Sequence, residues 1–125
     1  MKLLLSILLL AAPAVAADVP SGQPVSLHEV LVDAQDDATY LRFRFLAPMI
    51  AEGPDKISFA TAGEDMKYLC ETLALPYIAQ YTLEGDKVVI SFMDRITEFG
   101  IADPDAVQYF EAFRPESDSC IWDDF

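Results

Sequence analysis

Residues 39–46, which read Thr-Tyr-Leu-Arg-Phe-Arg-Phe-Leu, are the stretch that decides the fold. Apolar residues occupy every second position from Leu41 to Phe45, so an extended chain gathers them on one face. Arg42 and Arg44 then lie on the opposite face. The pattern predicts a strand that has one face in a core and a second, polar face.

A partner strand is predicted directly upstream, at Leu27–Ala34, where the alternation is only partial. Residues 35–37, Gln-Asp-Asp, separate the two stretches and are typical of a turn. We therefore expect a β-hairpin. Downstream, we predict a loop at Ala47–Lys56 and a short strand at Ile57–Ala60.

An amphipathic helix is predicted next, beginning at residues 61–64 (Thr-Ala-Gly-Glu), which fit a capping box. Positions i, i+3, i+4 and i+7 of this segment would form one buried face. They are Met66, Leu69, Cys70 and Leu73. Pro76 lacks a backbone N–H, so we expect the helix to end there.

A second hairpin is predicted from Tyr77–Leu83 and Lys87–Met93, which alternate around Glu-Gly-Asp at residues 84–86. Residues 107–114 fit either a helix or an aromatic-rich strand. We favour a helical turn at Asp103–Val107 followed by a strand, and then an edge strand at Cys120–Trp122.

The N-terminus has the parts of a secretory signal peptide: Lys2, the apolar run Leu3–Leu10 and the small residues at 14–16. We predict cleavage after Ala16 and a periplasmic or secreted protein without a stable membrane anchor. The apolar run is shorter than the roughly 20 residues that span a bilayer.

The mature part is expected to form a single domain. Residues 17–24 are polar and contain Pro and Gly, which predicts a flexible lead-in. Residues 25–125 are long enough for one core but not for two.

With 21 acidic and 8 basic residues, the chain has a formal net charge of −13. This charge disfavours binding to nucleic acid, and it favours solubility or binding to a basic partner.

Cys70 and Cys120 are the two cysteines, and in an oxidising compartment they suggest one disulfide. A redox or metal site is the alternative, but the chain has no C-x-x-C and its lone histidine is distant in sequence. The predicted fold is α+β: a mainly antiparallel sheet with one amphipathic helix packed on it. The bridge would join that helix to the C-terminal strand.

No catalytic constellation is visible in the sequence. His28 is the lone imidazole, and its neighbour Glu29 is expected to point to the opposite face of the first strand, so the two should not act together. The glycines are isolated, so no phosphate cradle for a nucleotide is visible. We expect no cofactor and no enzymatic activity.

A cation site is the weaker alternative. Asp33, Asp36 and Asp37 surround one turn, and carboxylates are ligands for hard cations. The cluster does not match the EF-hand loop, and Asp is also common in turns for local hydrogen bonding. A small metal-dependent or hydrolytic module that uses the acidic turns is therefore the alternative function.

The preferred function is partner binding by a non-enzymatic domain. A basic protein of the cell envelope is one example of such a partner. Candidate anchors are Met49, Ile50, Trp122 and Phe125, because apolar and aromatic side chains dominate interface energetics. The competing interpretation is that they simply cover the sheet.

The second half of the chain also contains a set of characteristic stretches. They are Phe92-Met93-Asp94-Arg95, Phe99-Gly100, Asp103-Pro104, Tyr109-Phe110-Glu111-Ala112-Phe113-Arg114 and Cys120-Ile121-Trp122. Together they resemble a family of short exported alphaproteobacterial proteins of unknown function, over most of the mature domain. Some members are labelled acetolactate synthase. We do not transfer that label, because such enzymes are several times longer and bind thiamine diphosphate through a Gly-Asp-Gly motif that this chain lacks.

Overall fold

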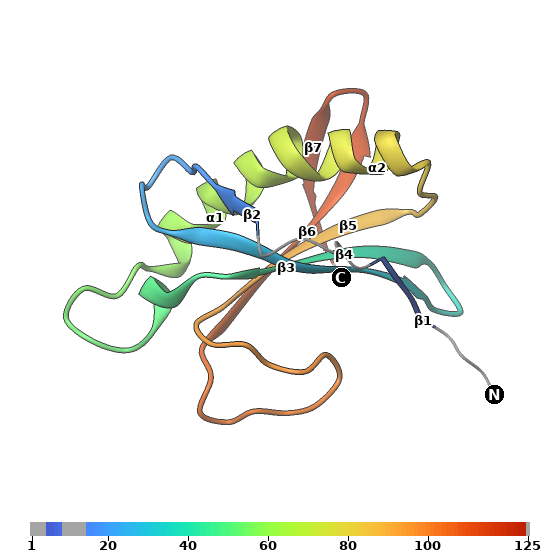
Figure 1. Cartoon of the computed structure of the whole chain (residues 1–125). Coiled ribbons are helices and arrows are strands. Elements are labelled where there is room, and N and C mark those ends of the chain that lie inside the picture. Colours follow the sequence, from blue (N-terminus) through green and yellow to red (C-terminus); the bar gives the residue numbers. More distant parts are fainter. Residues whose placement is uncertain (1–4, 9–14, 125) are drawn as a thin grey trace.

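A computed structural model describes residues 5–8 and 15–124. One sheet runs in the order β1-β3-β4-β5-β6-β7, and β2 also pairs with β3. The strands are β1 (Leu5–Leu8), β2 (Val15–Ala17), β3 (Val25–Ala34), β4 (Thr39–Leu46), β5 (Lys87–Met93), β6 (Gln108–Glu116) and β7 (Ser119–Asp123). The helical segments are η1 (Pro48–Ile50), α1 (Phe59–Leu69), the π-turn η2 (Cys70–Ala74) and α2 (Leu75–Tyr81). Pairing is antiparallel except between β4 and β5, and the helices lie across one face (Figure 1).

The predicted hairpin is confirmed: β3 and β4 pair antiparallel, from Ser26 opposite Leu46 to Ala34 opposite Thr39. The register shifts between Leu27 and Glu29, which is a β-bulge. The extra residue explains why the alternation of β3 is only partial. Along β3, the residues that face the core are three positions apart where the bulge intervenes and two positions apart after it.

The core lies between the sheet and the helices, and the predicted α+β fold is confirmed. The largest fully buried side chains include four phenylalanines on three neighbouring strands and one helix methionine. They are Phe43, Phe45, Phe92, Phe113 and Met66. Burying aromatic side chains of this size supplies the dominant favourable term in folding.

The helix begins earlier than predicted. α1 starts at Phe59, and Ser58 is its N-cap, with its hydroxyl accepting a hydrogen bond from the Thr61 N–H at 3.1 Å. The predicted capping box at residues 61–64 and the short strand at Ile57–Ala60 are therefore wrong. Ser58 is as good a cap as Thr61, and its choice places residues 59 and 60 inside the helix.

The helix also continues past Pro76, so the predicted second hairpin is wrong. The π-turn η2 ends where the Leu75 N–H bonds to the Cys70 carbonyl, and Pro76 then occupies the first turn of α2, where a missing N–H is tolerated. α2 ends at Tyr81, and its C-cap residue Thr82 has a left-handed backbone (φ 52°). Instead of leading a hairpin, β5 returns from the helices and pairs parallel to β4.

The C-terminal part follows the favoured interpretation, because residues 108–116 form strand β6 and β7 contains the predicted edge strand. The predicted helical turn at Asp103–Val107 is a tight turn instead. The Asp103 carbonyl accepts from the Ala106 N–H at 3.2 Å, and the Asp103 carboxylate accepts from the Asp105 N–H at 3.1 Å. Asp favours such local bonds over a continuing helix.

The Cys70–Cys120 disulfide is confirmed, with a sulfur–sulfur distance of 2.02 Å. It joins η2 to β7, as expected for a bridge between the helix and the C-terminal strand. The Glu71 carboxylate reinforces the junction by accepting a hydrogen bond from the Cys120 N–H at 3.0 Å.

Within the described residues, no helix is long and apolar enough to cross a membrane.

The lead-in at residues 17–24, expected to be flexible, is instead fixed to α1. The fully buried Asp65 carboxylate accepts from the Ser21 N–H (2.9 Å), the Ser21 hydroxyl (2.6 Å) and the Gln23 amide (2.8 Å). Val19 packs into the core beside them. A buried carboxylate needs such partners, and the polar lead-in supplies them.

Candidate functional site

The face of the sheet opposite α1, here called the back face, is covered by one long loop. This back-face loop comprises residues 94–107, joins β5 to β6, and lies on the far side of the sheet from the helices (Figure 1). Arg42 and Arg44 of β4 project toward it, as the alternation of residues 39–46 predicted. The contacts of these two arginines position the loop.

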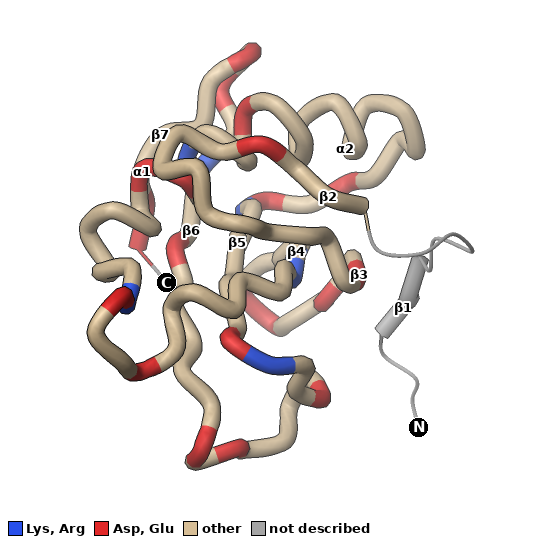
Figure 2. The backbone as a smooth tube through the Cα atoms, turned by 60° about the vertical axis from the view of Figure 1, so that its left-hand side comes forward, with Lys and Arg blue, Asp and Glu red and all other residues tan. Residues whose placement is uncertain are grey.

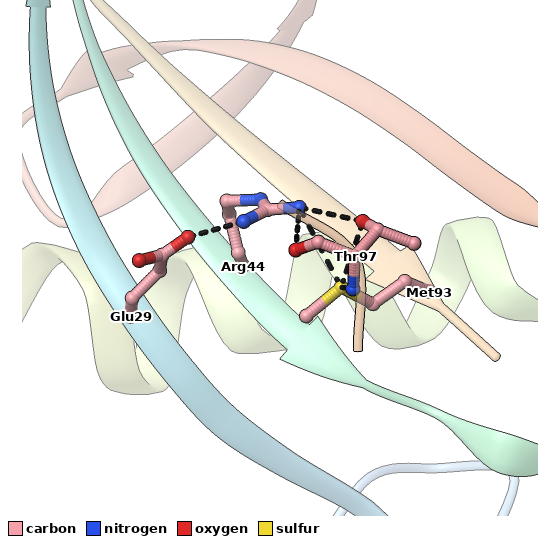
Figure 3. Close-up of polar contacts among 4 residues, drawn as sticks. All are labelled: Glu29, Arg44, Met93 and Thr97. Atoms are coloured by element: carbon pink, nitrogen blue, oxygen red, sulfur yellow. Dashed lines mark hydrogen bonds and ion pairs between the residues drawn. The ribbon is translucent and has the colours of Figure 1, made fainter. Parts of the chain in front are cut away.

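Arg44 is the centre of the polar contacts beneath the loop (Figure 3). Its side chain is only 5% exposed. Nη1 donates to the Glu29 carboxylate on β3, while Nη2 donates to the Thr97 carbonyl at 3.0 Å and the Thr97 hydroxyl at 2.8 Å. The Met93 sulfur lies 3.6 Å from Nη2. One buried guanidinium thus joins two strands to the loop, with its charge compensated by Glu29.

Arg42 supports the same loop from a neighbouring position. Its Nε donates to the Asp33 carboxylate at 2.8 Å. Its guanidinium carbon lies 5.2 Å from the centre of the Phe99 ring, and that of Arg44 lies 5.6 Å from it. Cation–π attraction at these distances holds the Phe99 ring against the sheet.

Asp94 closes the neck of the loop. Its carboxylate accepts from the Val107 N–H at 3.0 Å, and its own N–H donates to the Val107 carbonyl at 3.0 Å. Hydrogen bonds from the Arg95 guanidinium, aided by the bond from Val107, hold the pKa of Asp94 below its ordinary value. The loop is therefore fixed at its neck by Asp94 and at Thr97 by Arg44.

The fixed loop presents apolar side chains to solvent. Ile96, Phe99 and Ile101 are 52%, 36% and 60% exposed, and Phe110 on the adjoining strand β6 is 45% exposed. We call these four residues the back-face patch. Two cavities border it and share Phe99: one of about 570 Å³ beside β3, here called the edge cavity, and one of about 250 Å³ over Arg42 and Arg44.

The edge cavity changes the interpretation of His28 and Glu29. Adjacent residues of a regular strand face opposite ways, which is why these two were expected not to act together. The bulge at this position breaks that rule, and both residues line the edge cavity with Leu31 and loop residues 96–99. The Glu29 carboxylate is nevertheless engaged by Arg44.

The acidic turn expected to be a candidate cation site is arranged differently. Both carboxylate oxygens of Asp33 accept hydrogen bonds, from the Gln35 amide at 2.7 Å and from Arg42. Asp36 and Asp37 are exposed. In the part of the chain that the structure describes, no group of three or more His, Cys, Asp or Glu residues is placed to hold a metal ion.

The candidate partner-binding residues do not form one surface. Ile50 is fully buried and its side chain is not available to a partner, which corrects the expectation. Met49 and Trp122 are exposed, but Met49 borders a shallow hollow with Glu52 and Lys56 that Trp122 does not line. Trp122 packs against Phe113 on the sheet, with ring centres 4.9 Å apart. Phe125 lies outside the described residues.

The sequence did contain a signal for the back-face patch. The segment between β5 and β6 holds two isoleucines and a phenylalanine but has no regular apolar periodicity. Apolar side chains in an irregular segment either fill a core or remain exposed for a partner. Two arginines on one strand of a very acidic chain were the second signal.

Comparison with known proteins gives a family but no activity. A family model described as "Family of unknown function (DUF6497)" matches residues 5–125. A search of curated proteins found no match. A search of solved structures found none either.

Proposed function

The chain belongs to the DUF6497 family of unknown function, and from its geometry we propose that it is an exported, non-enzymatic protein that binds a basic partner through the back-face patch. The observation that carries the proposal is an exposed set of apolar side chains on a loop fixed by the buried Arg44. Apolar side chains in a fixed arrangement need little ordering on binding, which favours affinity.

A binding role fits the arginines better than a catalytic one. Arg44 is occupied by Glu29 and Thr97, and Arg42 by Asp33. Guanidinium groups that already have these partners position the loop rather than hold a substrate. Their charges are also compensated, so they do not oppose a basic partner.

The preference for a basic partner follows from charge. Asp and Glu are distributed along the whole described chain, whereas Lys and Arg are few (Figure 2). Glu98 is exposed within the back-face loop itself. Negative charge on and around the loop would accelerate association with a basic protein, and salt would weaken the effect.

Export is supported by two features. The N-terminal residues 1–16 have the composition of a signal peptide. The Cys70–Cys120 disulfide is typical of an oxidising compartment. We therefore place the working protein, residues 17–125, in the periplasm or outside the cell.

The proposal is tested by capture with the oxidised mature chain. We expect one or a few basic proteins from a periplasmic extract to bind at low salt and to be released by a salt step. Their binding should persist in the presence of EDTA. Ile101→Ser should abolish capture, while Tyr68→Ser, a change at an exposed residue on α1, should not. The proposal would be contradicted if the Ile101→Ser variant still captured the partner. It would also be contradicted if EDTA abolished capture, and that result would favour the metal-dependent alternative.

A further inference from the structure

The outer edge of β3 is occupied by the chain's own N-terminus. β1 pairs antiparallel with β3, from Leu5 opposite Asp33 to Leu8 opposite Val30. β2 pairs with the first part of β3, from Val15 opposite Leu27 to Ala17 opposite Val25. If residues 1–16 are removed on export, all of β1 is lost and only Ala17 of β2 remains. The edge then presents unpaired backbone N–H and C=O groups.

The exposed edge would lack most of the usual protection. Natural edge strands are often short or carry lysine and proline, as barriers to further pairing. β3 is ten residues long and contains neither, whereas β7 at the other edge is five residues long. The β3 acids Glu29 and Asp33 are engaged by Arg44 and Arg42. The bulge disturbs the strand before Glu29 and leaves Val30–Asp33 regular.

The edge cavity lies directly beside this regular segment. It measures about 570 Å³ and is lined by His28, Glu29 and Leu31 of β3 and by residues 96–99 of the back-face loop. In an antiparallel pair, directly opposed residues point to the same face of the sheet. A side chain opposite Leu31 on an added strand would therefore border the cavity. This combination of a free edge and a neighbouring pocket is the arrangement by which peptides bind as added strands.

We propose that the β3 edge of the mature chain binds an extended apolar segment of the partner, flanked by a basic residue, as an added antiparallel strand. The inference rests on the proposed function, because it assumes export with loss of residues 1–16 and names how the partner is held. Ile96 and Phe99 belong to both the back-face patch and the edge cavity, so one partner can cover both.

The charges select the occupant. Glu98 is exposed at the edge cavity, and the chain has a formal net charge of −13. A second copy of this chain would bring an equally acidic surface to the edge, which like-charge repulsion disfavours. In a segment of the expected kind, the apolar side chains would enter the edge cavity. A flanking lysine or arginine would be attracted by the negative charge of the chain. The N-terminus that pairs here in the full chain has this character, with Lys2 before an apolar run.

The test uses the oxidised mature chain and a synthetic peptide with the sequence of residues 2–8 followed by two lysines for solubility. Fluorescence anisotropy should show saturable binding. The same peptide with N-methyl groups on alternate backbone nitrogens should bind at least tenfold more weakly, because it cannot complete the ladder. Amide hydrogen exchange should slow within residues 30–33 when the unmodified peptide is bound. Equal binding of both peptides, or unchanged exchange in β3, would overturn the inference.

Two matched isoleucines separate this inference from the proposed function. Ile96→Ser should weaken peptide binding several-fold because Ile96 lines the edge cavity, whereas Ile101→Ser should leave it unchanged because Ile101 does not. If the peptide fails to bind while Ile101→Ser still abolishes partner capture, strand addition is wrong and the proposed function stands. If sedimentation shows the mature chain to be a dimer that the peptide dissociates, the occupant is a second copy and the inference is overturned.

Discussion

The two faces of the sheet are stabilised by different kinds of interaction. Against the helices, the core around Phe43 and Phe92 consists mostly of buried apolar side chains. On the back face, a few directional contacts from Arg44 and Asp94 hold the back-face loop. Apolar burial is non-directional and tolerates variation in detail, whereas hydrogen bonds fix one geometry. The first face therefore supplies stability, and the second defines the shape presented to a partner.

The largest effect is expected from Phe43→Ala on the helix side. Removing a fully buried phenylalanine should lower the free energy of unfolding by about 3–5 kcal/mol, measured by urea denaturation. Phe110→Ala is the matched control, because Phe110 is an exposed phenylalanine on the back face. It should cost less than about 1 kcal/mol. Similar costs for the two variants would remove the distinction between the faces.

Arg44→Met tests the back face. It leaves the largely buried Glu29 carboxylate without its partner, so we expect a loss of about 2–3 kcal/mol and faster amide exchange within residues 94–107. Arg114→Met is the control, since the Arg114–Glu116 pair is largely exposed. Its cost should stay below about 0.5 kcal/mol. A uniform increase in exchange over the whole chain would contradict a local role for Arg44.

Asp94 should make the loop sensitive to acid. Its pKa is lowered in the folded state, so the ionised carboxylate contributes stability above its ordinary value near 3.8, and this contribution is lost as the pH falls through the folded-state pKa. Asp94→Asn should cost about 1–2 kcal/mol at pH 7 and less at pH 3, where the carboxylate is partly protonated. Urea denaturation at both pH values measures the difference. A cost that does not change with pH would show that charge is not involved.

The smallest effect is expected from a charged residue on the helix side. Glu111 of β6 faces α1, with its carboxylate close to Gly63, and burial raises its pKa. Ionisation then opposes folding, so stability falls as the pH rises through the unfolded and folded pKa values. Glu111→Gln should raise the free energy of unfolding by a few tenths of a kcal/mol at pH 7 and by nothing at pH 3. A loss of stability at pH 7 would show that the carboxylate has an undetected favourable contact.

Periodicity predicted the helix side well and the back face poorly. The alternating strand at residues 39–46 and the helix face of Met66 and Leu69 are local patterns, and both are confirmed. The continuation past Pro76 depends on a π-turn, which has no simple sequence signal. Arg44 was placed on the correct face, but its partners stand 15 and 53 residues away along the chain. Contacts of this kind follow from tertiary structure and not from a local pattern.

The parallel pairing of β4 with β5 has a consequence for folding kinetics. These neighbours at the centre of the sheet are separated in sequence by residues 47–86, so the hairpin of β3 and β4 is synthesised long before its central partner. Until β5 arrives, Phe43 and Phe45 have a neighbouring strand on one side only, and such exposed aromatic surface promotes aggregation. Pairing across a long loop is also slow, because loop closure precedes the stabilising contacts. The disulfide, which needs Cys120 of the last strand, forms too late to protect this early state.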